Sequence, residues 1–170
     1  DLVEPALVVA TADPSLLRML TFALEQMRLP YQTFTSGTVV LQTLLDLPRG
    51  GRPTVVVLDV DLPGVDGHAI LERLGVERPD AFLIVVLSSH ADESVQVRSL
   101  LAGALDHLAK PFNVRVLMAK LQRWTTIARS LFSSASGALQ FVPPPPIDAK
   151  ACALVITESR LFKRSVTTSC

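Results

Sequence analysis

Three side chains that together could carry out phosphoryl chemistry each follow an apolar run. An unbroken run of apolar and β-branched residues at 54–58 ends in Asp59, and similar runs end before Ser88 and Lys110. An aspartate can attack phosphorus and hold an acyl phosphate, while a cation and a hydroxyl steady the charge of the transferred group. As strands of one parallel sheet, these runs would place the three side chains at the edge where such sheets bind ligands.

The elements that must position these side chains alternate between strand and helix patterns. Short apolar runs predict strands at 6–10, 31–34, 54–58, 82–87 and 105–109. Apolar residues at three- and four-residue spacing predict helices at 14–27, from Ser36, at 67–74, at 92–103 and from Asn113. Asp13 is expected to cap the first helix. Five βα units of this kind predict an α/β fold, a doubly wound parallel sheet with strand order 2-1-3-4-5.

The last two helices carry expectations of their own. In the helix at 92–103 we expect Val97, Leu100 and Leu101 to face inward. The last helix has an apolar stripe at Leu117, Leu121, Trp124, Ala128 and Leu131. That stripe is longer than a helix needs to cover a sheet, so its end either projects and pairs with another chain or frays near Ser130.

Length and composition limit the classes of function. At 170 residues the chain is one domain plus a further segment, and its formal net charge of zero argues against a nucleic-acid partner. The two cysteines, Cys152 and Cys170, both lie in the tail, as in proteins of a reducing compartment. No apolar run approaches the roughly 18–20 residues of a membrane span. We expect a cytoplasmic protein with a domain at 1–131, a Ser/Pro-rich linker at 132–150, and a segment at 151–170.

Three segments, 58–67, 87–89 and 103–112, resemble the receiver domain of bacterial two-component response regulators. The resemblance covers about residues 5–128 and implies a flavodoxin-like (βα)5 fold. It implies that Asp59 is the phosphoacceptor, taking phosphate from a histidine kinase or phosphotransfer protein. Ser88 would be the switch hydroxyl, Lys110 would pair with the phosphate, and the peptide bond before Pro111 would be cis.

The sequence departs from this family at two places. The first strand of the family usually ends in an acidic pair that binds Mg²⁺, and Thr11 and Ala12 stand there instead. Because Mg²⁺ prefers carboxylate ligands, Asp59 remains as the evident one, and Asp61 could help only if its loop turns inward. We therefore expect weak or absent Mg²⁺ binding. His107 is the second departure, because the family commonly has Tyr or Phe at this switch position; a His keeps a flat ring but can titrate.

These departures leave two functional interpretations. The first is a degenerate, or pseudo-, receiver that acts through protein–protein contacts with little Mg²⁺-dependent phosphorylation. The alternative is a working phosphoacceptor switch at Asp59, whose phosphorylation would bias the face formed by the fourth helix, fifth strand and fifth helix, a possible homodimer surface. No general base faces a substrate pocket, so we do not expect an enzyme.

The remaining expectations concern two other histidines and the tail of the chain. His68 and His90 are expected to face solvent without a metal-spaced partner. The sequence 66–68 is similar to the start of a cobalamin-binding motif, but Leu71 stands where that motif needs Gly. Residues 153–164 repeat the pattern of 7–18, so 151–170 is either the start of a second receiver or an apolar tail.

Overall fold

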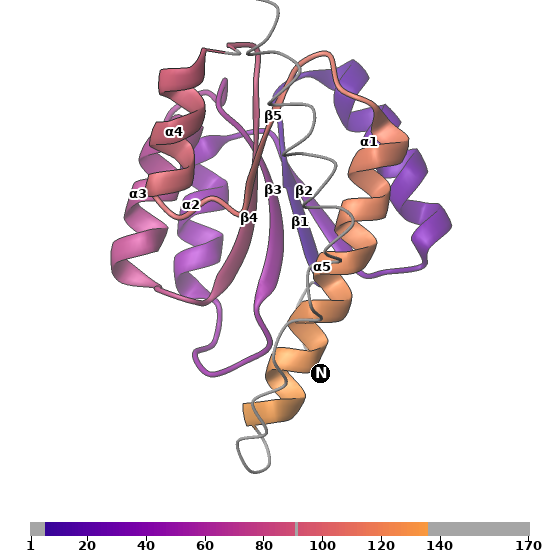
Figure 1. Ribbon diagram of the computed structural model, residues 1–170, viewed down its shortest axis with the longest axis vertical. Helices are drawn as coiled ribbons and strands as arrows, with labels where there is room; N and C mark the ends of the chain where they lie inside the picture. Colours follow the sequence, from indigo (N-terminus) through magenta and orange to yellow (C-terminus); the bar gives the residue numbers. More distant parts are fainter. Residues whose placement is uncertain (1–5, 91, 136–170) are drawn as a thin grey trace, which may run out of the picture. The chain divides into compact units, whose positions relative to one another are not determined.

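A computed structural model describes residues 6–90 and 92–135 of the chain. Its strands are β1 (Leu7–Ala10), β2 (Tyr31–Phe34), β3 (Thr54–Asp59), β4 (Phe82–Ser88) and β5 (Asp106–Ala109). Its helices are α1 (Pro14–Met27), α2 (Gly37–Asp46), α3 (Gly67–Glu77), α4 (Glu93–Leu101) and α5 (Val114–Ala135). The strands form one parallel sheet in the order β2-β1-β3-β4-β5, which confirms the predicted flavodoxin-like topology (Figure 1).

The sheet is covered on both faces, which is why its central strand reads as a continuous apolar run. In β3, Val55 and Val57 pack toward α1 and α5, whereas Val56 and Leu58 pack toward α2 and α3. Figure 1 shows the two pairs of helices on opposite sides of the sheet. Every residue of β3 is buried. The two cores hold the strand rigidly, so the residue at its end has a fixed position.

The strand register brings the predicted site residues to one edge. Ala10 of β1 lies beside Leu58 of β3, and Asp59 lies beside Leu87 of β4. The next residues along β1 and β4 are Thr11 and Ser88, so both flank Asp59. The predicted cap of α1 is confirmed, because the Asp13 carboxylate accepts hydrogen bonds from the backbone N–H groups of Ser15 and Leu16.

Two glycines allow the loop after β3 to pack between the starts of α2 and α3. A Cβ at Gly37 would lie 1.7 Å from the Val65 carbonyl oxygen, and one at Gly67 would lie 2.5 Å from the Asp59 carbonyl oxygen. Both distances are shorter than any real contact of a Cβ, and both neighbours are backbone atoms that cannot turn away. The loop that follows Asp59 is therefore wedged between two helix starts.

The prediction for the inward face of α4 is wrong. Val97, Leu100 and Leu101 are 46%, 48% and 84% exposed, and Ser99 is the one buried residue of the helix. The less exposed side of the helix carries Val95, Ser99 and, at its C-terminal cap, Ala102, which lie at four- and three-residue spacing and have smaller side chains on average. The strand beside this helix, β5, is itself short and only partly buried, so α4 covers little apolar surface there.

The long last helix follows its predicted stripe for most of its length. Leu117, Leu121, Trp124 and Ala128 are buried, while Leu131 is 51% exposed. Fraying near Ser130 is a wrong expectation, since α5 continues to Ala135. None of the helices within the described ranges has the length and apolar character that a bilayer crossing requires. Residues 132–135 of the expected linker belong to α5, and the rest of the linker and the tail lie outside the described residues.

Candidate phosphoacceptor site

Asp59, at the carboxyl end of β3, is 1% exposed and has donors on both carboxylate oxygens. Lys110 Nζ donates to Oδ2 at 2.6 Å, and the Thr11 hydroxyl donates to the same oxygen at 2.7 Å. The backbone N–H of Asp61 donates to Oδ1 at 3.1 Å. A buried carboxylate needs such partners, because an unpaired one would lose its hydration without compensation.

Thr11 reaches Asp59 because it directly continues β1, whose last residue pairs with Leu58. Its side chain is fully buried, and its hydroxyl oxygen also accepts the Asp13 backbone N–H at 3.2 Å. Sequence reasoning treated Thr11 only as a lost acid. The signal that could have revealed its role is a hydroxyl side chain directly after the first predicted strand. A buried carboxylate at the same edge needs such a hydrogen-bond donor.

Ser88 and Lys110 are joined to each other through the backbone. Ser88 is fully buried at the end of β4, and its hydroxyl oxygen accepts the His90 backbone N–H at 3.0 Å. The Lys110 backbone N–H donates to the Ser88 carbonyl at 2.8 Å. The bond between Lys110 and Pro111 is cis, as predicted. Asp59, Ser88 and Lys110 thus come from three neighbouring strands to one sheet edge.

Asp61 contacts the Asp59 carboxylate through its backbone N–H. Its carboxylate is exposed and accepts a hydrogen bond from the Ser89 hydroxyl at 3.2 Å. Within the described residues, no three or more His, Cys, Asp or Glu side chains gather where they could hold a metal ion. Mg²⁺ requires octahedral oxygen ligands that usually include one or two free carboxylates. At this edge Oδ2 of Asp59 is held by a cation and a hydroxyl, and Thr11 and Ala12 add no carboxylate.

His107 lies one strand further out, half-buried on β5. Its Nδ1 is 3.1 Å from the Ser99 hydroxyl oxygen of α4, and its Nε2 is buried without a hydrogen-bond partner. Burial is the main cause that lowers the pKa of His107, and the charge of His68 lowers it further. A backbone group of His90 and the charge of Asp106 raise this pKa, but by less. The expectation that His68 faces solvent is wrong, because its ring is half-buried and its Nδ1 is enclosed; His90 is exposed as expected.

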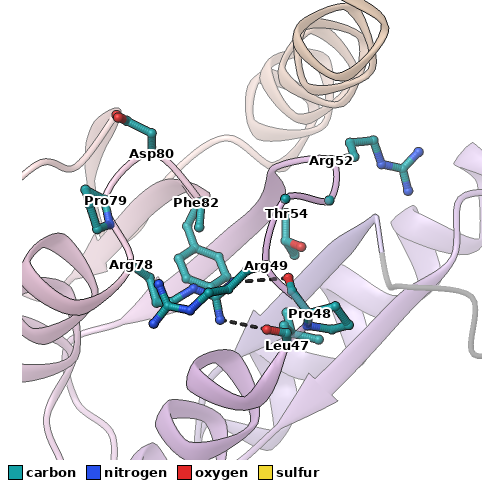
Figure 2. A pocket seen from close by; sticks show the side chains of 12 residues that line it. Leu47, Pro48, Arg49, Arg52, Thr54, Arg78, Pro79, Asp80 and Phe82 are labelled. Carbon is teal, nitrogen blue, oxygen red and sulfur yellow. Dashed lines mark hydrogen bonds between the residues drawn. The ribbon is translucent and has the colours of Figure 1, made fainter. Parts of the chain in front are cut away.

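A cavity of about 300 Å³ lies at the opposite end of the sheet, beside the first residue of β3. It is bounded by buried Arg78, whose guanidinium donates to the carbonyls of Leu45, Leu47 and Pro48 at 2.9, 2.8 and 3.2 Å. Figure 2 shows this guanidinium beside the Phe82 ring, whose centroid is 5.6 Å from Cζ. Thr54, which lines the cavity, and Asp59 stand five positions apart along β3, roughly 17 Å at the rise of a strand. The cavity is therefore not part of the Asp59 site.

Known proteins match this architecture over most of the described chain. The model of the response regulator receiver domain family matches residues 7–122. The chain belongs to this family. The DNA-binding transcriptional regulator NtrC of Escherichia coli K12 is 30% identical over 115 residues, 68% of this chain and 24% of NtrC. The transcriptional regulatory protein AfsQ1 of Streptomyces coelicolor is 33% identical over 118 residues, 69% of this chain and 50% of AfsQ1.

A solved receiver domain supports the same assignment. The BeF3-activated receiver domain of DrrB is 27% identical, with a TM-score of 0.61, and the match covers 73% of this chain and 99% of that one. The chain spans a quarter to a half of the length of its curated relatives NtrC and AfsQ1. Receiver domains are signalling modules of two-component systems that interact with histidine kinases or phosphotransfer proteins. The family therefore gives the class of function, and the site geometry bears on how this member works.

Proposed function

We propose that this receiver domain is degenerate: its own side chains hold Asp59 in place of a metal ion, and it signals through protein–protein contacts. Mg²⁺-dependent phosphorylation of Asp59 would be weak or absent. The observation that carries the proposal is the Thr11 hydroxyl on Asp59 Oδ2, the oxygen that also pairs with Lys110. Both donors belong to the chain, so the carboxylate is neutralised without a bound ion.

Two physical arguments support this proposal. A phosphodonor brings further negative charge to Asp59, and a divalent ion normally offsets that charge during phosphoryl transfer. Here the Lys110 ammonium would have to do so alone, because Thr11 and Ala12 add no charge. Two donors already occupy Oδ2 and one occupies Oδ1, so few lone pairs of Asp59 remain open for attack on phosphorus. Both features slow the reaction.

The alternative is a working phosphoacceptor switch, and one observation favours it. Asp59, Ser88 and Lys110 stand at the ends of neighbouring parallel strands, the arrangement that phosphoryl transfer to an aspartate needs. In that reaction an Asp59 oxygen attacks phosphorus of a small donor such as acetyl phosphate. The bond between phosphorus and the acetate oxygen breaks, acetate leaves, and Asp59 carries an acyl phosphate.

The deciding measurement is the intact mass of the chain after incubation with acetyl phosphate and Mg²⁺. Three proteins are compared: the wild type, Asp59→Asn, and a double variant, Thr11→Asp/Ala12→Asp, that restores the acidic pair. We expect no gain of a phosphoryl group in the wild type or in Asp59→Asn, and a gain in the double variant. The double variant makes a negative result in the wild type meaningful, because it shows that the remaining machinery works.

A phosphoryl gain in the wild type that is absent from Asp59→Asn would establish the switch and overturn the degenerate interpretation. A fold check by circular dichroism accompanies each protein. If the double variant also gains no phosphoryl group, the absence of phosphorylation has a cause other than the missing acidic pair. Thr11 would then not be the residue that prevents phosphorylation.

Two smaller proposals concern partners and the rest of the chain. The face formed by α4, β5 and α5 exposes Val97, Leu100, Leu105 and Val116, which suits a protein partner or a second copy of the chain. Sedimentation of the full chain over a range of concentrations tests the homodimer. The sequence repeat between 7–18 and 153–164 supports a second receiver that begins at 151.

A further inference from the structure

α4 is attached to the sheet differently from the other helices. α1, α2 and α3 each bury three or more residues, most of them large and apolar, but the buried residue of α4 is Ser99. The cap residue Asp92 makes no side-chain hydrogen bond to the start of α4. A helix with so little buried apolar surface has a low free energy of local opening. A polar contact at Ser99 therefore has a large influence on where α4 sits.

That contact is with the ring of His107. The Ser99 hydroxyl donates its hydrogen to the Val95 carbonyl at 3.1 Å, so towards His107 Nδ1, 3.1 Å away, it acts as an acceptor. Nδ1 must then carry a hydrogen, and in the neutral ring the second nitrogen, Nε2, is a bare acceptor. Nε2 is enclosed and has no partner. The neutral ring tolerates this enclosure far better than a charged one would.

The groups around the ring decide what a second proton would do. From α3, His68 presents a half-buried ring whose Nδ1 is also enclosed without a partner. From the loop after β4, a backbone group of His90 favours the protonated ring, but burial opposes it more strongly. On its own strand, the Asp106 carboxylate pairs with Lys120 of α5, and its charge favours the protonated ring less than burial opposes it. A charge on Nε2 would therefore stand in an enclosed place, where burial and a second imidazole oppose it more than the His90 backbone and Asp106 favour it.

We propose that His107 is a proton-operated latch: its neutral ring holds α4 through Ser99, and protonation at Nε2 releases α4 from the sheet edge. All three histidines of the chain, His68, His90 and His107, lie around this one contact. The latch changes the exposed face of α4, with Val97, Leu100 and Leu101, without any change at Asp59. It does not depend on whether Asp59 takes phosphate.

Linkage gives the direction of the effect. The lowered pKa of His107 means that the packed conformation binds the proton less tightly than one in which the ring is in water. As pH falls through the ordinary range of histidine, near 6.5, the open conformation gains protons first and becomes more populated. The packed arrangement is fully favoured above that range.

The test is amide hydrogen exchange of the full chain at about pH 7.5 and about pH 5, corrected for the intrinsic rates. In the wild type, we expect the opening of α4 to increase at least about threefold at the lower pH. The amides of α2 serve as an internal reference that should not change. In His107→Phe, which keeps a flat ring without a titrating group, we expect the pH effect on α4 to disappear. His90→Gln is the matched control and should keep it.

Two further variants keep the outcome decisive. If circular dichroism shows that His107→Phe does not fold, His107→Gln serves in its place as the variant with a non-titrating side chain at this position. Ser99→Ala removes the acceptor of Nδ1, so α4 should already be less protected at the higher pH. The latch is overturned by a wild-type α4 with no pH effect, by an equal pH effect in the non-titrating variant, or by wild-type protection in Ser99→Ala.

Discussion

At the scale of single residues, the chemistry of this receiver domain turns on what satisfies Asp59. Removing one partner of a buried carboxylate costs far more stability than replacing both members of the ion pair by apolar residues. Lys110 supplies the charge and Thr11 supplies a neutral donor, both on Oδ2. The side chain of Lys110 is 20% exposed, while that of Asp59 is 2% exposed. The aspartate is thus the partner that cannot compensate with water.

Lys110→Met should therefore destabilise the domain strongly. We expect a loss of about 3–5 kcal/mol in the free energy of unfolding, because Asp59 would remain buried without its cation. Urea unfolding measures the loss, with Asp59→Asn and the double variant Asp59→Asn/Lys110→Met completing a double-mutant cycle. The double variant should recover most of the loss. A single Lys110→Met within about 0.5 kcal/mol of the wild type would contradict the contact with Asp59.

Restoring the acidic pair should create a metal site where we expect the wild type to have a poor one. In Thr11→Asp/Ala12→Asp, the added carboxylates would repel Asp59 unless Mg²⁺ binds between them. We expect Mg²⁺ at tenfold excess over its dissociation constant to raise the Tm of this variant by about 4 °C. The wild-type Tm should change no more in MgCl₂ than in NaCl of equal ionic strength. An equal rise in both proteins would show that Thr11 is compatible with metal binding.

At the scale of elements, Arg78 connects two helices that the sequence does not link. It ends α3, is 7% exposed, and its guanidinium donates to backbone carbonyls at and after the end of α2. The last carbonyls of a helix lack partners within it, and the dipole there favours a cation. Arg78 thus serves as the C-terminal cap of α2 from a distance of more than thirty residues along the chain.

Arg78→Met should cost about 2–4 kcal/mol in urea unfolding, since several buried carbonyls would lose their donor. Arg78→Lys should recover only part of this, because an ammonium cannot reach the same carbonyls with a planar fork. Arg73→Met on the same helix is the control. Arg73 pairs with Glu77 at the surface, with side chains 54% and 42% exposed, and its loss should change little. Equal effects of the two methionine variants would refute the capping role.

At the scale of the whole molecule, the pKa of His107 makes stability depend on pH. Because burial lowers this pKa in the folded protein, the unfolded chain binds the proton more readily. The stability that His107 contributes is fully present above the unfolded value, near 6.5, and is lost as pH falls below it. Urea unfolding at a series of pH values should show this fall, and His107→Phe should flatten the curve in that range. A wild-type curve that stays flat below pH 6.5 would contradict the burial of the ring.

Much of this molecule follows from local patterns, and the rest follows from contacts between distant segments. The strands and the cap at Asp13 were predictable because apolar runs and capping residues act within a few positions of each other, and the series of five βα units then indicated the strand order. The hydroxyl contact of Thr11 with Asp59 spans 48 residues, and no local pattern encodes it. The inward face of α4 was mispredicted for a related reason, since which side of a helix is buried depends on its packing against a distant strand and not on the local spacing of its apolar residues.

The donors at Asp59 also have a consequence for the timing of a signal. An acyl phosphate has a lifetime, so a domain that carries one remembers a stimulus until the group is hydrolysed. Thr11 and Lys110 are parts of the chain, so they are neither added by a stimulus nor removed by hydrolysis. A cell that uses such a domain would set its output through the number of copies made and the rate at which they are removed. The memory of the pathway would then lie in protein synthesis and turnover.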